Sequence, residues 1–199
     1  AALVVAAILF DLTAGAFGGV RDRVRALELV SYAATASWVA GIAELYPICR
    51  SITGDGLRAT LSAVAGRVPL TLHEVPSGTR AFDWTVPEEW NISDACVLDA
   101  GGRRVIDFRR SNLHVVNYSA PVNARVSLRE LKEHTFTLPD HPEWIPYRTS
   151  YFKENWGFCL KHAQLEALAE GEYDVNIDSS LRDGHLTYGE YFVKGSTSE

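Results

Sequence analysis

The chain has 199 residues, of which 47% are hydrophobic and 22% are charged, and its formal net charge at pH 7 is −6. This length suits one large domain or two small ones, and the hydrophobic share is sufficient for a packed core. The negative net charge argues against a nucleic-acid partner, because nucleic-acid-binding proteins usually present a basic face.

The first segment, residues 1–10, is an apolar run that is too short to span a membrane and lacks the basic leading region of a signal peptide. We expect a buried strand here, or the end of a longer hydrophobic segment, and no membrane partner. A Gly-rich turn at 11–19 followed by a helix would outline a dinucleotide-binding unit, but its glycines lack the GxGxxG spacing. A nucleotide-binding fold over 1–40 is therefore the weaker interpretation.

Two helices are predicted next. Residues 21–46 are compatible with a helix that Pro47 ends, because the residue before a proline is disfavoured in helical geometry. A second helix follows, for which Thr53 is the predicted N-cap. Arg50 and Ser51 could join Thr53 in an anion pocket at this helix start, but simple capping is the favoured alternative.

An irregular aromatic stretch, residues 73–90, separates the helical part of the chain from a turn-rich part. Pro76 and Pro87 interrupt a regular strand ladder within it, whereas Trp84 and Trp90 are too apolar for a solvated linker. We therefore predict a domain boundary here, with these aromatic side chains in the core of the unit that follows.

The middle of the chain reads as short strands and turns. Residues 95–98 and 103–108 flank a Gly-rich turn and are predicted to form a hairpin, and residues 114–118 are a further strand candidate. Ser127 begins a capping box that predicts a short helix.

The last part of the chain alternates between helix and strand patterns. A helix is predicted over 160–169, and a strand over 173–178, where apolar and polar residues alternate. The Asp183-Gly184 pair is typical of a tight turn, so we predict that this strand forms a hairpin with a return strand over 185–193.

The residues alone show no complete catalytic site. The chain contains no HExxH motif, GxSxG elbow or Walker loop. His162 and Glu166 lie one helical turn apart and could share a metal, but two ligands do not make a site, so an exposed pair is favoured. Cys159 could be a nucleophile, although nothing in the sequence marks it as activated.

The cysteines indicate no zinc ribbon or disulfide framework. Cys49, Cys96 and Cys159 are widely spaced and include no CxxC pair. We expect buried, reduced thiols in a cytoplasmic protein.

Five blocks of this sequence together resemble a bacterial and archaeal family of aminopeptidase-like proteins. The blocks are residues 44–56, 73–90, 107–118, 144–159 and 183–190. They are long, and they extend over nearly the whole chain from Gly41 to about Lys194, so the resemblance is specific. Members of this family are proposed di-zinc hydrolases with the zinc-aminopeptidase α/β fold.

The resemblance implies an α/β fold class, present in this fragment as α+β. It implies an incomplete aminopeptidase-like domain built from residues 41–72 and 145–199, a small inserted β-rich domain at 73–144, and a winged helix downstream. Residues 1–40 match nothing in the family and are an unassigned extension. Because the chain begins at Ala1 without Met and ends just after a strand pattern, we expect it to be a fragment.

The chemistry implied by the resemblance is zinc-dependent hydrolysis of a peptide or amide substrate, in which two zinc ions activate a bridging water. Family members place the first zinc ligands, a His and then an Asp, just beyond the segment that resembles 183–194, and a Glu acts as general base further downstream. No position here matches a metal ligand. We therefore expect no catalytic or metal-binding residue in this chain, an inactive fragment, and a complete protein that could form a homo-oligomer.

The aromatic segment near residues 148–156 provides the candidates for substrate binding. Arg148, Tyr151 and Trp156 are the best candidates for substrate binding, because they lie in the aromatic segment that re-enters the aminopeptidase-like domain. Packing is the alternative role for each of them. The competing function is a non-catalytic module that binds peptides or sugars on its aromatic side chains.

Overall fold

A computed structural model of the chain describes residues 2–14 and 22–195. The chain divides into two compact units, Ala1–Pro47 and Ile48–Glu199. Helices and short strands both contribute to the structure, so the predicted α+β class is confirmed.

The first unit is a pair of helices, α1 (Ala2–Ala14) and α2 (Arg23–Leu45). The predicted strand at 1–10 is wrong, and the Ala-rich composition of this run explains why it is helical instead. The helix predicted over 21–46 is confirmed as α2. Asp22 is its N-cap, and the carboxylate accepts hydrogen bonds from the backbone N–H groups of Val24 (3.0 Å) and Arg25 (3.2 Å).

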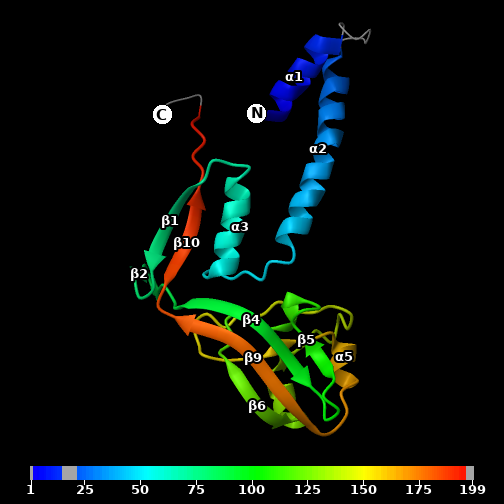
Figure 1. Ribbon diagram of the computed structural model, residues 1–199, viewed down its shortest axis with the longest axis vertical. Coiled ribbons are helices and arrows are strands. Elements are labelled where there is room, and N and C mark those ends of the chain that lie inside the picture. Colours follow the sequence, from blue (N-terminus) through cyan, green and yellow to red (C-terminus); the bar gives the residue numbers. More distant parts are fainter. Residues whose placement is uncertain (1, 15–21, 196–199) are drawn as a thin grey trace. The chain divides into compact units, whose positions relative to one another are not determined.

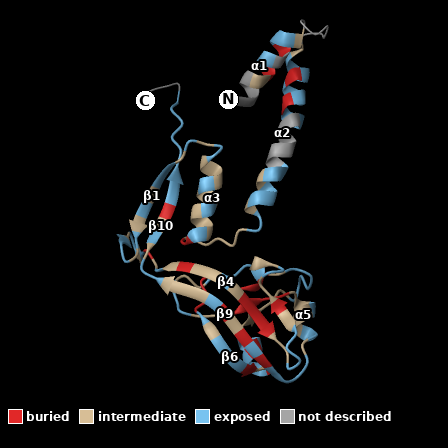
Figure 2. Ribbon diagram, viewed as in Figure 1, coloured by how far each residue is buried: buried red, intermediate tan, exposed pale blue. Residues whose placement is uncertain are grey.

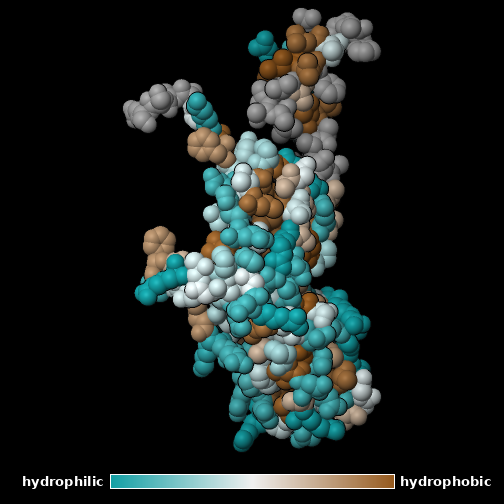
Figure 3. Space-filling model, turned by 60° about the vertical axis from the view of Figure 1, so that its left-hand side comes forward, coloured by the Kyte–Doolittle hydropathy of each residue, from teal (hydrophilic) through white to brown (hydrophobic). Residues whose placement is uncertain are grey.

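The helical pair has many apolar side chains on its surface (Figure 3). Among the described residues, its buried cluster consists of Ala7, Ala26 and Val30. Larger apolar side chains lie exposed on both helices, namely Ile8, Leu9, Leu12, Val24, Leu27, Leu29, Val39 and Ile42. The predicted Gly-rich turn falls mostly at 15–21, outside the described residues. In the described part of the chain, no helix is both long enough and apolar enough to cross a membrane.

The second unit begins with a helix that packs beside a two-stranded ladder (Figure 1). The helix is α3 (Asp55–Ala65), and the strands are β1 (Thr71–Pro76) and β10 (His185–Glu190). The strands pair in antiparallel register from Thr71 opposite Glu190 to Pro76 opposite His185. A Cβ on Gly189 would lie 3.3 Å from a methyl group of Leu61, so the ladder and α3 approach closely there.

Residues 77–184 leave and rejoin the β1–β10 ladder at one point. The backbone N–H of Ser77 donates to the carbonyl of Gly184 (2.9 Å), and the N–H of Gly184 donates to the Ser77 hydroxyl (3.1 Å). That hydroxyl in turn donates to the carbonyl of Pro87 (2.9 Å). The predicted hairpin across Asp183-Gly184 is therefore wrong, because the return strand pairs with β1 and not with the strand before the turn.

A four-stranded antiparallel sheet lies within residues 77–184. Its order is β5 (Arg104–Asp107), β4 (Glu89–Leu98), β9 (Glu172–Arg182) and β6 (Val122–Ser127). The predicted hairpin over 95–98 and 103–108 is confirmed as β4 and β5, and the predicted strand at 173–178 lies within β9. A small hairpin of β2 (Arg80–Ala81) and β3 (Trp84–Thr85) precedes the sheet.

Short elements cover one face of this sheet. They are the 3₁₀ turn η2 (Asn112–His114), α4 (Leu128–Glu133), β7 (Thr135–Phe136), β8 (Phe158–Cys159) and α5 (His162–Glu166). The predicted cap is confirmed, since the Ser127 hydroxyl accepts from the N–H of Glu130 (3.3 Å). The strand predicted at 114–118 is instead η2 and isolated bridges, and the helix predicted at 160–169 is shorter.

The core of the second unit lies between the sheet and these short elements (Figure 2). Alternate residues of β4 and β9 point into it, together with Phe158 and Leu131, which are fully buried. By contrast, no residue of α3 is fully buried. The core is therefore centred on residues 89–177, and α3 lies outside it.

The sheet joins strands from both parts of the predicted domain division. β9 belongs to the segment 145–199, which the resemblance assigns to the aminopeptidase-like domain, yet it lies between β4 and β6 from the segment 73–144. Separating these segments would break both ladders of the central strand.

Ser77 provides a test of the closure between Ser77 and Gly184. In Ser77→Ala, the Gly184 N–H and the Pro87 carbonyl each lose a hydrogen-bond partner. We expect the free energy of unfolding to fall by about 1–2 kcal/mol, measured by urea denaturation. Ser62→Ala is the matched control, because Ser62 is exposed on α3. An equal effect of the two substitutions would contradict a role for the Ser77 hydroxyl in the closure.

Candidate functional site

The segment between Ile48 and α3 packs against the start of β4, and we call this contact region the junction. Thr53 lies at its centre. Thr53 is only 1% exposed. Its hydroxyl accepts from the backbone N–H of Trp90 (3.1 Å) and lies 2.5 Å from the Tyr118 hydroxyl. Thr53 therefore does not cap α3 as predicted. The N-cap is Gly54, and the side-chain oxygen of Asn91 accepts from the first helical N–H, that of Asp55 (2.7 Å).

Two glycines allow the junction to pack this closely. Gly54 has a φ of +90°, and a Cβ there would lie 2.1 Å from the carbonyl oxygen of Trp90. A Cβ on Gly56 would lie 1.9 Å from the carbonyl oxygen of Cys49. Both separations are far below van der Waals contact, so only glycine fits at these positions. The start of α3 is thereby fixed against β4.

Tyr118 joins the junction to the loop that follows η2. It is a non-glycine residue in the left-handed region, with a φ of 69°, and its ring stacks on Trp90 at 5.8 Å. Its hydroxyl donates to the carbonyl of Glu88 (2.9 Å), so the short bond with Thr53 is donated by the threonine. Burial raises the pKa of Tyr118 to about 12, which keeps this donor protonated at neutral pH.

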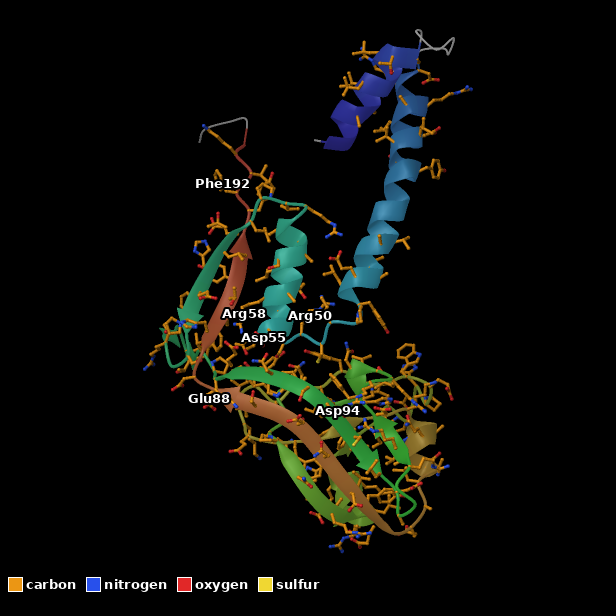
Figure 4. All side chains as sticks on the ribbon, in the orientation of Figure 1. Arg50, Asp55, Arg58, Glu88, Asp94 and Phe192 are labelled. Carbon is orange, nitrogen blue, oxygen red and sulfur yellow. The ribbon has the colours of Figure 1, made fainter. Side chains whose placement is uncertain are left out.

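An ion pair ties α3 to β4 and β10. The guanidinium of Arg58 donates to both carboxylate oxygens of Glu89, at 2.5 and 3.0 Å, and to Asp55 at 2.7 Å. Glu89 also accepts from the backbone N–H of His185 (3.2 Å). The hydrogen bonds from Arg58 are the main cause that lowers the pKa of Glu89 to about 2. Figure 4 shows Arg58 and Asp55 at the start of α3, with Glu88 at the start of β4.

A polar cavity of about 420 Å³ lies beside this junction. Its lining comes from the segment 49–56, from the first half of β4 and from the end of β9. Ser51 and Thr53 line it, and the Ser51 hydroxyl is buried without a hydrogen-bond partner among the described residues. Arg50, the third member of the alternative anion pocket, does not line this cavity, and its guanidinium donates to the hydroxyl of Thr60 (3.2 Å).

The three predicted substrate-binding residues lie in two places. The guanidinium of Arg148 covers the Phe136 ring at 5.5 Å, and Trp156 stacks on His134 at 3.7 Å, so both border the β7–β8 pair. Tyr151 instead packs edge-on against Tyr118 at 5.0 Å. Trp156 also packs against the core, whereas Arg148 is exposed. Their role in substrate binding stays a prediction.

Neither a metal centre nor an activated cysteine is evident in the part of the chain that the structure describes. No group of three His, Cys, Asp or Glu side chains there could hold a metal ion. His162 and Glu166 form the favoured helix pair, with Nε2 and Oε1 3.5 Å apart. All three cysteines are free, and burial raises the pKa of Cys49 and Cys159 to about 11, so these thiols are neutral at pH 7.

The residues that hold the junction together were not among the predicted site residues. Arg58 and Asp55 have the spacing of a helical ion pair, which is a visible signal. Glu89 and Asn91 are more than thirty residues away from their partners on α3, and nothing local marks them as partners.

Comparison with known proteins shows that the chain is similar to proteins described as peptidases or aminopeptidase-like. Residues 89–180 match a family described as a domain of unknown function (DUF2172). This range includes the four-stranded sheet except the last two residues of β9. A Clostridium acetobutylicum protein named "Putative polysaccharide biosynthesis protein with aminopeptidase-like domain" is 54% identical over 158 residues, which are 79% of this chain.

A solved structure from Clostridium acetobutylicum, described as that of a "putative peptidase", superimposes with a TM-score of 0.75 at 49% identity and covers 86% of this chain. This chain spans 36% of the length of the curated relative and 42% of the solved chain. Both relatives carry a peptidase description, which agrees with the resemblance at that coarse level.

Gly54 provides a test of the junction. We expect Gly54→Ala to lower the free energy of unfolding by about 2–4 kcal/mol, because the methyl group would collide with the Trp90 carbonyl in a backbone geometry that alanine disfavours. Gly66→Ala is the matched control, since Gly66 has a φ of −63° and its nearest non-neighbouring atom would lie 3.5 Å away. Chemical denaturation that finds equal losses for both variants would refute the close approach.

Glu89 makes the stability of the junction depend on pH. Because the folded-state pKa is lowered from 4.5 to about 2, the stabilisation from the ion pair is complete above about pH 5 and is lost as the pH falls towards 2. We expect Glu89→Gln to cost about 2–3 kcal/mol at pH 7 and progressively less at lower pH. Urea denaturation from pH 7 to pH 3 measures this. A constant difference across the range, as expected for the control Glu88→Gln at an exposed neighbour, would disprove it.

Proposed function

We propose that the complete protein containing this chain is an aminopeptidase-like hydrolase of peptide or amide bonds. The observation that carries this proposal is the solved peptidase-like structure, because 49% identity at a TM-score of 0.75 over 86% of the chain supports more than a shared fold. The name of the curated relative agrees with it. Since this chain covers less than half of either protein, the activity is proposed for the whole protein.

The β1–β10 ladder and α3 fit a larger α/β domain. Two strands with one helix are marginal as an independent unit. Apolar side chains lie exposed along this part of the chain, among them Leu72, Tyr188, Phe192 and Val193, and Phe192 extends past the end of β10 (Figure 4). We propose that the aminopeptidase-like domain covers these surfaces in the complete protein.

This proposal sets the limits of the insert at the Ser77–Gly184 closure. Residues 77–184 then form the inserted domain, and β1, α3 and β10 belong to the aminopeptidase-like domain. The N-terminal limit is close to the expected residue 73. The C-terminal limit moves from 144 to 184, because β9 is the central partner of both β4 and β6.

Zinc chemistry is proposed for the complete protein and not for these residues. The described side chains do not fit a zinc site, because they offer no cluster of three potential ligands. We propose that zinc, its ligands and the general base lie in the rest of the protein. Arg148 is exposed and could pair with a substrate carboxylate, so it is the strongest of the three proposed substrate contacts.

An activity assay on the complete protein tests the proposed function. We expect hydrolysis of leucine p-nitroanilide, loss of the activity with 1,10-phenanthroline, and its recovery on addition of zinc. N-acetyl-leucine p-nitroanilide is the matched control, since an aminopeptidase requires the free α-amine and should leave this substrate intact. A zinc-containing protein that hydrolyses none of a panel of aminoacyl p-nitroanilides would exclude the proposal.

A further inference from the structure

Strand β9 has a polar face that takes no part in the core. Its residues alternate strictly, so that Tyr173, Val175 and Ile177 are buried while the side chains between them point to the other face. That outer face carries, in order along the strand, Asp174, Asn176, Asp178, Ser180 and Arg182.

A β-bulge in β4 keeps the core residues Ala95 and Val97 off this face. Asn91 lies opposite Ser180 before the bulge, and Asp94 lies opposite Asp178 after it. Ser93 is the extra residue, and its hydroxyl donates to the carbonyl of Asp178 (3.1 Å) and contacts the carboxylate of the same residue. Without the extra residue, the second half of β4 would present its core side chains outward.

Two cavities follow this face and adjoin at Asp178. The cavity of about 420 Å³ at the junction is lined by Asp178, Ser180 and Arg182 from β9. A second cavity of about 340 Å³ is lined by Asn123 of β6 and by Asn176 and Asp178. The two cavities, which share Asp178, are together called the β9 groove here, and their outer-face residues from 176 to 182 span about 20 Å at the usual rise of a strand.

Four polar side chains of the β9 groove have no partner in the described part of the chain. Asn123, Asn176, Ser180 and Arg182 make no side-chain hydrogen bond or ion pair with any residue that the structure describes. On the same face, Asp174 pairs with Arg125 at 3.6 Å. The four unpaired side chains leave hydrogen-bonding groups available to a ligand in the cavities.

The composition of the groove selects a class of ligand. The groove carries amide, hydroxyl, carboxylate and guanidinium groups. Together these groups can donate hydrogen bonds to the hydroxyl groups of a ligand and accept hydrogen bonds from them. One Arg is too little positive charge for a polyphosphate ligand, and the groove offers few apolar surfaces for the side chains of a peptide. We propose that the β9 groove binds a neutral oligosaccharide of about four sugar units.

This binding site is independent of the proposed hydrolase activity. The groove is lined by the sheet and by the segment 49–56, and its residues include none of the three proposed substrate contacts. A catalytically inactive protein would therefore still bind the sugar, and an active one could fail to bind it.

Saturation-transfer difference NMR on the complete protein tests the inference, with maltotetraose, cellotetraose and tetra-N-acetylchitotetraose as probes. We expect saturable transfer to at least one of them. The double variant Asn176→Val/Ser180→Val, which retains residues that favour strands, should weaken its Kd at least about tenfold. Asp174→Asn is the matched control on the same face of the same strand, and it should bind like the unchanged protein.

Three results would overturn the inference. The first is the absence of transfer to all three probes. The second is unchanged binding in the double variant, or in Ser180→Ala if thermal unfolding shows that the double variant does not fold. The third is transfer to tetra-alanine amide that depends on Asn176 and Ser180, with none to the sugars, which would identify the groove as a peptide site.

Discussion

The antiparallel pairing of β1 with β10 is the constraint on which the second unit depends. It forces the ends of residues 77–184 together, and closing a loop of that length has an entropic cost. The cost is offset by contacts beyond the ladder itself. Arg58 binds Glu89 from α3, and Thr53 binds Trp90 and Tyr118. These contacts fix the start of β4 beside α3, so the sheet is held at the start of its first long strand as well as at the β1–β10 ladder.

The bulge in β4 gives the sheet its two different faces. On one side, Val97 and Ile177 pack with Phe158 in a dry core. On the other side, short polar side chains face two adjoining cavities. Without the bulge, the side chains in the second half of β4 would point to the opposite faces. Apolar residues would then face the cavities and polar residues would enter the core, which raises the free energy on both faces. The extra residue Ser93 therefore allows one face of the sheet to pack in the core while the other face lines the proposed binding groove.

Local patterns predicted local structure, but not the pairing of distant segments. The helix before Pro47, the turn between β4 and β5, and the cap at Ser127 follow from residues close in sequence. The Asp183-Gly184 turn failed as a hairpin signal because a tight-turn sequence does not determine which strand the chain pairs with next. Thr53 failed as a cap because a buried partner 65 residues away takes its hydroxyl. The resemblance to aminopeptidases indicated the class of protein, and the site itself emerged only from long-range geometry.

The meeting of Ser77 with Gly184 has an evolutionary consequence. The two ends of the segment meet through the hydrogen bonds between Ser77 and Gly184, and ends that lie this close allow one domain to be inserted into a loop of another. If the segment were deleted, Pro76 would still face His185, and a connection of two residues could bridge them. Removing the segment would thus leave the register of the ladder intact, whereas Thr53 and Arg58 would lose the partners that the segment provides.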